Sequence, residues 1–150
     1  LNNDFNLVLI GGNSRQIEST SNIAREKGLE ERVKILGTKP PAEIPYYLKA
    51  ADVLVSPRIL GTNIPLKIYS YLKSGVPVVA TDLYTHTQSI NENISILVAA
   101  KPKKIAQGVL DAVSEKGKII SQNALNYCKK KYSPQAYIGL VSEALKKGSR

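Results

Sequence analysis

Residues 51–82 read ADVLVSPRILGTNIPLKIYSYLKSGVPVVATD, and this stretch decides the fold. It contains two short apolar runs, Val53–Val55 and Pro77–Ala80, which are typical of buried parallel strands. Between them, Pro65 suits the first position of a helix, and Gly75 suits the residue at which that helix stops. Strand, loop, helix and strand in this order predict a βαβ unit.

The same alternation continues on both sides of this stretch. Upstream, the pattern predicts two more strands and two helices, at 6–10, 33–36, 17–27 and 42–51. Downstream it predicts a fifth strand at 94–98 and then only helices, the last beginning at Ser133-Pro134. The expected fold class is therefore α/β, a Rossmann-like parallel sheet with helices on both faces.

Ligands of such sheets bind in the loops after the carboxyl ends of the strands. Here those loops are expected at 11–16, 37–41, 56–65 and 81–88. In the first, Gly11 and Gly12 precede a helix, an arrangement that lets backbone N–H groups approach a phosphate, although a tight turn alone explains them equally well. Neither a dinucleotide-binding GxGxxG motif nor a P-loop is present.

The loop at 56–65 carries a clearer charge signal. No carboxylate occurs between Asp52 and Asp82, whereas Arg58, Lys67 and Lys73 do. A site for a diphosphate avoids carboxylates, because like charges repel strongly in a partly desolvated pocket. The alternative is a chance gap in a mostly buried stretch.

Two single residues carry chemistry that the pattern leaves open. His86, the one histidine, is expected in a polar loop, where it is either a catalytic or sugar-contacting residue or, more commonly for a single loop histidine, an ordinary surface residue. Cys128 is expected to be a small core residue of a helix.

Composition excludes several classes of protein. The chain has 150 residues, 43% hydrophobic and 22% charged, as expected of a folded domain. No apolar run reaches the roughly 18–20 residues that span a bilayer. One cysteine excludes an internal disulfide and a multi-cysteine zinc site, and we expect no metal site. Because the sequence lacks methionine, we expect it to be part of a longer chain or to be processed.

The net charge of +9 is concentrated in the last third of the chain. Residues 98–150 carry 11 Lys+Arg and 3 Asp+Glu, and residues 1–97 carry 10 and 9. The excess therefore says little about the loops above. It is expected to be a solvated helical surface or, as a weaker alternative, a peripheral contact with anionic lipid. Nucleic-acid binding is not expected, because Tyr127 beside Lys129–Lys131 falls on the apolar helical face.

Taken together, ADVLVSP (51–57), GTNIPLKIYSYLKSGVPVVATD (61–82) and HTQSI (86–90) resemble the carboxyl-terminal domain of retaining family 4 glycosyltransferases. The runs VLIGG (8–12) and VKILG (33–37) match in order and spacing. The resemblance implies the two-domain GT-B fold, of which residues 1–150 are expected to form the single nucleotide-sugar-binding domain. The amino-terminal acceptor domain is expected to be missing.

The resemblance also implies what the loops bind. The ligand would be a nucleotide-diphosphate sugar, such as a UDP- or GDP-sugar, with no cofactor. The sugar would pass to an acceptor hydroxyl with retention, in cell-envelope or capsular polysaccharide synthesis, in the cytoplasm or peripherally at the inner membrane face. The donor-binding residues implied are Gly11 and Gly12 at the phosphates, Leu36, Gly37 and Thr38 near the base, Gly61, Thr62, Asn63, Ile64, Pro65 and Leu66 at the sugar and diphosphate, and Ser70.

The sequence departs from the family's pattern in two places. One is an expected absence, that of the strand and the loop with Arg and Lys that usually begin the domain. The other concerns two glutamates that members commonly carry, separated by seven residues: of the matching positions, Thr62 agrees with a GTN subgroup, and Ser70 replaces the second glutamate. The second glutamate often binds the donor ribose, and serine loses that charge-assisted pair. The isolated domain is therefore expected to be inactive, and the alternative reading is a degenerate, non-catalytic binding module.

Overall fold

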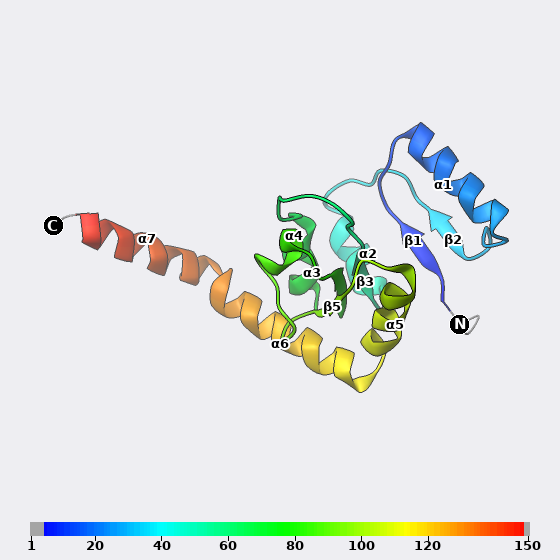
Figure 1. The fold of residues 1–150 in the computed structure, drawn as a ribbon. Coiled ribbons are helices and arrows are strands. Elements are labelled where there is room, and N and C mark those ends of the chain that lie inside the picture. Colours follow the sequence, from blue (N-terminus) through cyan, green and yellow to red (C-terminus); the bar gives the residue numbers. More distant parts are fainter. Residues whose placement is uncertain (1–4, 149–150) are drawn as a thin grey trace. The chain divides into compact units, whose positions relative to one another are not determined.

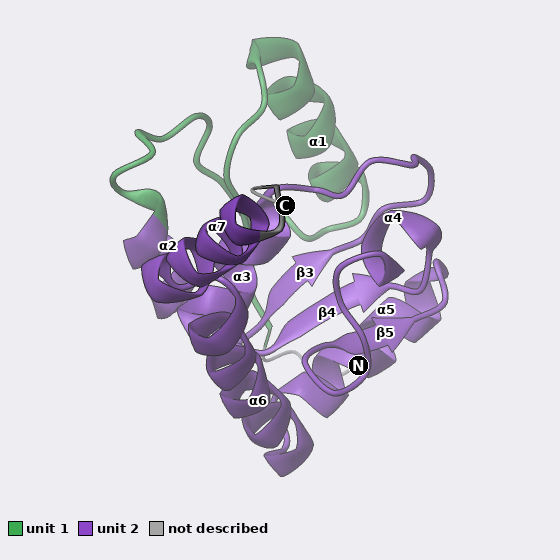
Figure 2. Ribbon diagram, turned by 90° about the vertical axis from the view of Figure 1, so that its left-hand side faces the viewer, with its two compact units in different colours: residues 1–44 green, residues 45–150 purple. Residues whose placement is uncertain are grey.

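The computed structural model describes residues 5–148 of the chain (Figure 1), the side chains of 147 and 148 excepted. It divides into two compact units, residues 1–44 and 45–150 (Figure 2). Each unit has its own sheet, with two parallel strands in the first and three in the second. The α/β class with parallel strands predicted from the sequence is confirmed.

The first unit is a βαβ element. Its strands are β1 (Leu7–Leu9) and β2 (Val33–Ile35), and the helix between them is α1 (Ser14–Glu26). Helix α1 begins with a capping box, in which the Asn13 side chain accepts from the Gln16 amide at 3.0 Å. The prediction that β1 is buried is wrong, since Leu7 and Val8 are about half exposed. In a two-stranded sheet, every strand is an edge strand, and α1 packs mainly on β2.

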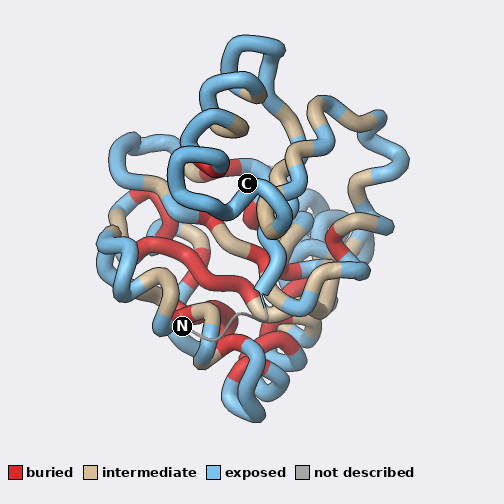
Figure 3. Tube along the Cα trace, turned by 90° about the vertical axis from the view of Figure 1, so that its right-hand side faces the viewer, coloured by how far each residue is buried: buried red, intermediate tan, exposed pale blue. Residues whose placement is uncertain are grey.

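The second unit holds the strands β3 (Leu54–Ser56), β4 (Val78–Thr81) and β5 (Ile96–Val98), paired in this order. All four residues of β4 are buried. Because successive side chains of a strand point to opposite faces, both faces of this central strand are covered. Buried residues concentrate in the strands of the second unit and in the segments 85–86 and 94–96, whereas α7 is exposed along almost its whole described length (Figure 3).

Six of the seven helices of the described chain lie in or at the border of the second unit. They are α2 (Ile44–Ala50), α3 (Lys67–Ser74), α4 (Tyr84–Thr87), α5 (Pro102–Ala112), α6 (Glu115–Lys131) and α7 (Pro134–Gly148), with α1 completing the set in the first unit. Helix α5 lies against β4 and β5, where Gly108 admits the Val79 and Val98 side chains. Cys128 is buried in α6, as predicted.

Several predicted boundaries differ from the structure, among them the start of α1, which lies at Ser14 and not at Ile17. Helix α3 begins at Lys67, two residues after the expected start at Pro65, because its first turn is tight and the Ile68 amide bonds to the Pro65 carbonyl at 2.9 Å. The segment 81–88, predicted to be a loop, contains the short helix α4. No helix within residues 5–148 is long and apolar enough to cross a membrane.

Candidate functional site

The candidate site lies at the carboxyl end of the three-stranded sheet. Strand β3 ends at Ser56 and continues into loop 57–66, which leads to α3. Strand β4 ends at Thr81 and continues into α4. Since β3 and β4 are paired in parallel, with Ser56 opposite Ala80, loop 57–66 and α4 leave the sheet side by side.

The His86 side chain forms hydrogen bonds that connect α4 to the ends of β3 and β4. Its ring is fully buried, and its Nδ1 lies 2.9 Å from the Thr81 carbonyl oxygen. A carbonyl only accepts, so Nδ1 carries the hydrogen and donates it. Nε2 is then the acceptor for the Ser56 hydroxyl at 3.0 Å. The prediction of a loop histidine, exposed or contacting sugar, is replaced by a buried residue whose two ring nitrogens are both used.

The surroundings of His86 favour its neutral form. Burial lowers its pKa below the usual range, and the nearby cations Arg58 and Lys67 lower it further. The hydrogen bond with the Thr81 backbone acts in the opposite direction. In the neutral ring Nε2 accepts from the Ser56 hydroxyl, whereas a protonated ring would reverse this bond and Nε2 would donate to the Ser56 oxygen.

Side chains from α4 and from the start of the loop bind the backbone of loop 57–66. The Arg58 guanidinium donates to the Asn63 carbonyl at 2.7 Å and to the Thr85 hydroxyl at 2.9 Å. The Thr85 hydroxyl also donates to the Asn63 carbonyl, at 2.5 Å. The carbonyl of the preceding loop residue, Thr62, accepts from the side-chain amide of Gln88 at 2.7 Å. The loop is therefore fixed by side chains and not by a strand ladder.

Gly61 makes room for this arrangement. Its φ of +118° is a conformation that side chains rarely adopt, and an added Cβ would lie 3.2 Å from the Arg58 guanidinium. The glycine predicted for sugar contact thus has a second reason to be glycine, which is to let the arginine reach Asn63.

Arg58, in loop 57–66, and Lys67, directly after the loop, have no acidic partner among the described residues. The three ion pairs of the described residues all lie elsewhere, at Glu31–Lys34, Asp111–Lys116 and Glu115–Lys118. Desolvation, followed by the repulsion of Arg58, lowers the pKa of Lys67. Two neighbouring cations without a carboxylate repel each other, and a bound anion would relieve that repulsion.

Helix α3 adds backbone donors at the same place. Its cap residue, Leu66, makes no side-chain hydrogen bond to the first turn, and that turn holds no acidic residue. The Ile68 and Tyr69 amides already donate to the Pro65 and Leu66 carbonyls, at 2.9 and 3.3 Å, but within the described residues the Leu66 and Lys67 amides donate to no protein acceptor. The helix dipole places partial positive charge at this end. The amino end of α3 therefore has the chemistry of an anion site, with Arg58 and Lys67 close by.

The predicted site residues divide between the two units. Gly61 to Leu66 lie together in loop 57–66, and Ser70 is exposed in α3. Gly11, Gly12, Leu36, Gly37 and Thr38 lie in the first unit. There the Gly11 amide donates to the Gly37 carbonyl at 2.7 Å, so the structure brings these two predicted glycines together.

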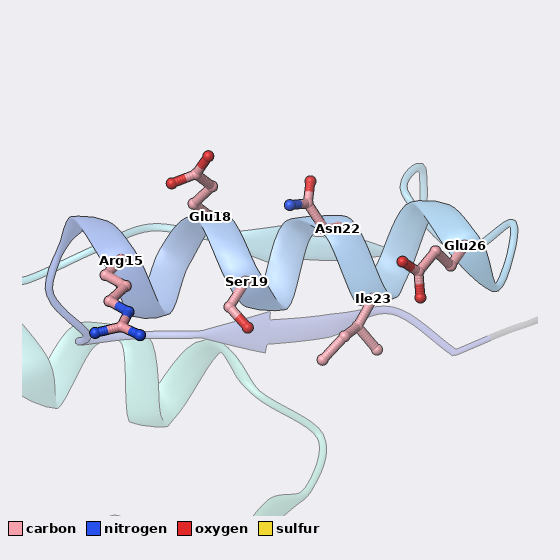
Figure 4. Close-up of a pocket in the computed structure, with 6 residues that line it drawn as sticks. All are labelled: Arg15, Glu18, Ser19, Asn22, Ile23 and Glu26. Atoms are coloured by element: carbon pink, nitrogen blue, oxygen red, sulfur yellow. The ribbon is translucent and has the colours of Figure 1, made fainter.

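A shallow hollow runs along one face of α1 and is lined by Arg15, Glu18, Ser19, Asn22, Ile23 and Glu26. Figure 4 shows that these side chains project from successive turns of a single helix, α1. Two of the six carry carboxylates, which disfavour a phosphate ligand, and none is a predicted site residue. This hollow is not the candidate site.

Sequence reasoning missed Thr85 and Gln88 as site residues. The signal that could have found them is their position directly after β4, in a segment that parallel topology places beside loop 57–66. Within residues 5–148, no group of three or more His, Cys, Asp or Glu side chains is arranged to hold a metal ion.

Comparison with protein families gives one match. The sequence model of the family described as "Glycosyl transferases group 1" matches residues 1–115. No curated protein sequence matches the chain.

Several solved structures share the fold. The Anabaena protein HepE in complex with UDP has a TM-score of 0.80 and 20% identity, and the match covers 97% of this chain and 42% of HepE. Sucrose-phosphate synthase from Thermosynechococcus elongatus has a TM-score of 0.75 and 18% identity, over 95% of this chain and 39% of the synthase.

A third solved structure is itself a partial chain. The carboxyl-terminal domain of the group 1 family protein LpcC from Francisella tularensis has a TM-score of 0.70 and 21% identity, over 87% of this chain and 71% of that domain. The chain therefore spans about two fifths of the first two proteins but most of the third.

Proposed function

The chain belongs to the group 1 glycosyl transferases, and from this premise we propose that it binds the nucleotide-diphosphate sugar donor of such a transferase. The donor diphosphate occupies loop 57–66 and the amino end of α3. In the whole protein, the sugar passes to an acceptor hydroxyl with retention of anomeric configuration.

One observation carries this proposal: the cations Arg58 and Lys67, which have no acidic partner among the described residues, lie beside the start of α3, where no side chain caps the helix. A diphosphate brings the negative charge that this arrangement lacks. Preorganised amides and cations also stabilise the leaving diphosphate as charge develops on it, which is the main catalytic contribution expected of a protein in such a transfer.

The chemistry is a substitution at the anomeric carbon. The bond between that carbon and the diphosphate oxygen breaks, and a bond to the acceptor oxygen forms. The acceptor hydroxyl loses its proton, and the nucleoside diphosphate leaves with the electron pair of the broken bond. Residues of this chain act on the leaving group, and we expect the acceptor to be held by a separate amino-terminal domain. The chain alone is then a donor-binding domain that does not transfer.

Titration calorimetry with UDP, GDP and their sugars tests the proposal. We expect binding that weakens when Lys67 is replaced by leucine and is unaffected when Lys49, in the last turn of α2, is replaced. A ligand at 100 times its dissociation constant also raises the stability of the chain by about 2.7 kcal/mol. Absence of binding by any nucleoside diphosphate would refute donor binding by this chain.

A degenerate, non-catalytic binding module is the second candidate, and Ser70 favours it. Serine stands where the family commonly has a ribose-binding glutamate, and its side chain is exposed on α3. We expect Ser70→Glu to tighten nucleotide binding by roughly 10- to 100-fold if the charge-assisted bond is restored, as its typical 1.5–3 kcal/mol implies. Binding by Ser70→Glu but not by the natural sequence would favour the degenerate module.

The basic composition of the carboxyl-terminal helices supports a location at a membrane surface. We propose peripheral contact with the anionic inner face of a membrane, in a transferase of envelope or capsular polysaccharide synthesis. Residues 98–150 are strongly basic, and α7 exposes Tyr137, Ile138 and Leu140. Sedimentation with vesicles tests this: the chain should bind vesicles containing phosphatidylglycerol and not those of phosphatidylcholine. Equal recovery with both would refute it.

A further inference from the structure

Two consecutive carbonyl groups of loop 57–66 point toward α4. The Thr62 carbonyl accepts from Gln88, and the Asn63 carbonyl accepts from both Arg58 and Thr85. Three side chains thus fix the orientation of two neighbouring peptide groups.

The fixed carbonyls determine where the next amides point. The described chain has no cis peptide bond, and in a trans peptide the C=O of one residue and the N–H of the next point in opposite directions. The Asn63 and Ile64 amides are therefore directed away from α4. Within the described residues, neither amide donates to a protein acceptor. The next residue, Pro65, has no N–H group. The next backbone donors after the Asn63 and Ile64 amides are therefore those at the start of α3.

We propose that Arg58, Thr85 and Gln88 are positioning residues that turn the Asn63 and Ile64 amides toward the donor diphosphate. The inference rests on the proposed function for the identity of the ligand, but the orientation of the loop is independent of it. None of the three needs to touch the diphosphate for this role, although the Arg58 charge also favours an anion nearby.

Burial makes the arrangement rigid. Thr85 is fully buried, and its hydroxyl is both an acceptor for Arg58 and a donor to Asn63. It belongs to the same short helix as His86, which is bonded to the ends of β3 and β4. The hydrogen bonds of two adjacent α4 residues, Thr85 and His86, therefore connect the loop to the central strand of the sheet. Loops that order before the ligand arrives lose less entropy on binding.

The variants Thr85→Val and Gln88→Leu test the inference in the chain as it exists. Valine keeps the shape of Thr85 but removes the hydroxyl, and Thr85→Ser restores it. Thr87→Val is the matched control, because Thr87 is exposed on the same helix and bonds only to Leu83 of its own turn. Gln88 is exposed, so its replacement leaves the core intact.

Two measurements read the outcome. NMR order parameters of the 62–64 amides, without ligand, are expected to fall from about 0.85 to below 0.6 in Thr85→Val and Gln88→Leu, and to stay unchanged in Thr87→Val. The dissociation constant of UDP or GDP is expected to rise about tenfold in the two positioning variants, because the competent loop is then a smaller fraction of the population. Thr85→Ser should restore both values.

The order parameters test the positioning of the loop, and nucleotide binding by the natural chain tests the proposed function. Order parameters that match the natural chain in both variants would overturn the inference, and so would a loosened loop that binds the nucleotide with unchanged affinity. If the natural chain binds no nucleoside diphosphate, the proposed function fails, and the order parameters still decide whether the three side chains orient the loop.

Discussion

The His86→Leu variant is expected to destabilise the chain because it breaks the connection between two strand ends. The Ser56 hydroxyl, which is fully buried, then loses its hydrogen-bond partner at 3.0 Å. An orphaned buried hydroxyl costs about 1–3 kcal/mol. The Thr81 carbonyl keeps the Leu83 amide as a donor at 2.9 Å, so it loses one of two bonds, worth about 0.5–1.5 kcal/mol.

Together these terms predict a loss of about 1.5–4.5 kcal/mol in the free energy of unfolding. Urea denaturation followed by circular dichroism measures it. The matched control is the double variant Ser56→Ala/His86→Leu, in which the Ser56 hydroxyl is absent, while the Thr81 hydroxyl, 3.2 Å from Nδ1, loses that contact in both His86 variants. Its loss should be smaller than the sum of the two single losses by about 1–3 kcal/mol.

The same variant has a pH signature. Burial lowers the pKa of His86 in the folded chain, so below the ordinary histidine value of about 6.5 the unfolded state binds the proton more readily. Stability is therefore fully present above about pH 7 and decreases as the pH falls through 6.5 toward the lowered folded value. Because His86 is the sole histidine of the sequence, this decrease should be absent in His86→Leu.

Two results would refute this reasoning. A loss below about 0.5 kcal/mol would mean that Ser56 finds another partner and that the ring is not a connection. A pH dependence between 7 and 5.5 that persists unchanged in His86→Leu would mean that another group titrates there.

Other variants test the charge of the site and the end of α3. Arg58→Leu should weaken the binding of UDP or GDP by about 10- to 100-fold in calorimetry, as loss of a charged hydrogen bond implies; equal weakening by Lys73→Leu, in the last turn of the helix, would show only a general charge effect. Gly75→Ala should lower the free energy of unfolding by about 1–2 kcal/mol, because φ is +81° and the new Cβ would lie 3.1 Å from Leu125. Gly139→Ala, with open space in α7, should raise helix stability by up to about 1 kcal/mol in thermal melts, and a loss there would contradict the helix assignment.

Much of the fold follows from the sequence alone. The run 77–80 is apolar, bounded by a glycine and an aspartate region, and long enough only for a strand, so local pattern suffices to predict β4. Gly75 predicts the end of α3 for a local reason, its left-handed backbone. The gap in carboxylates from 53 to 81 likewise predicts an anion site without any coordinates.

Tertiary structure decided what local pattern could not. His86 has the neighbours of a polar loop residue, and only the pairing of β3 with β4 brings Ser56 within reach of its ring and buries it. The sequence shows Arg58 only as a cation with no carboxylate near it in the chain. In the structure its guanidinium is held by a hydrogen bond to Thr85, 27 residues away. β1 was expected to be buried, and its exposure depends on how many strands and helices surround it.

The physical reason is the range of the interactions. Helix ends, turns and apolar runs depend on residues a few positions apart, and the sequence by itself predicted most of them to within a few residues, together with the family to which the chain belongs. The direction of a loop amide depends on side chains that the parallel topology brings together from distant positions. The structure alone therefore decided that Thr85 and Gln88 face the carbonyls of Thr62 and Asn63.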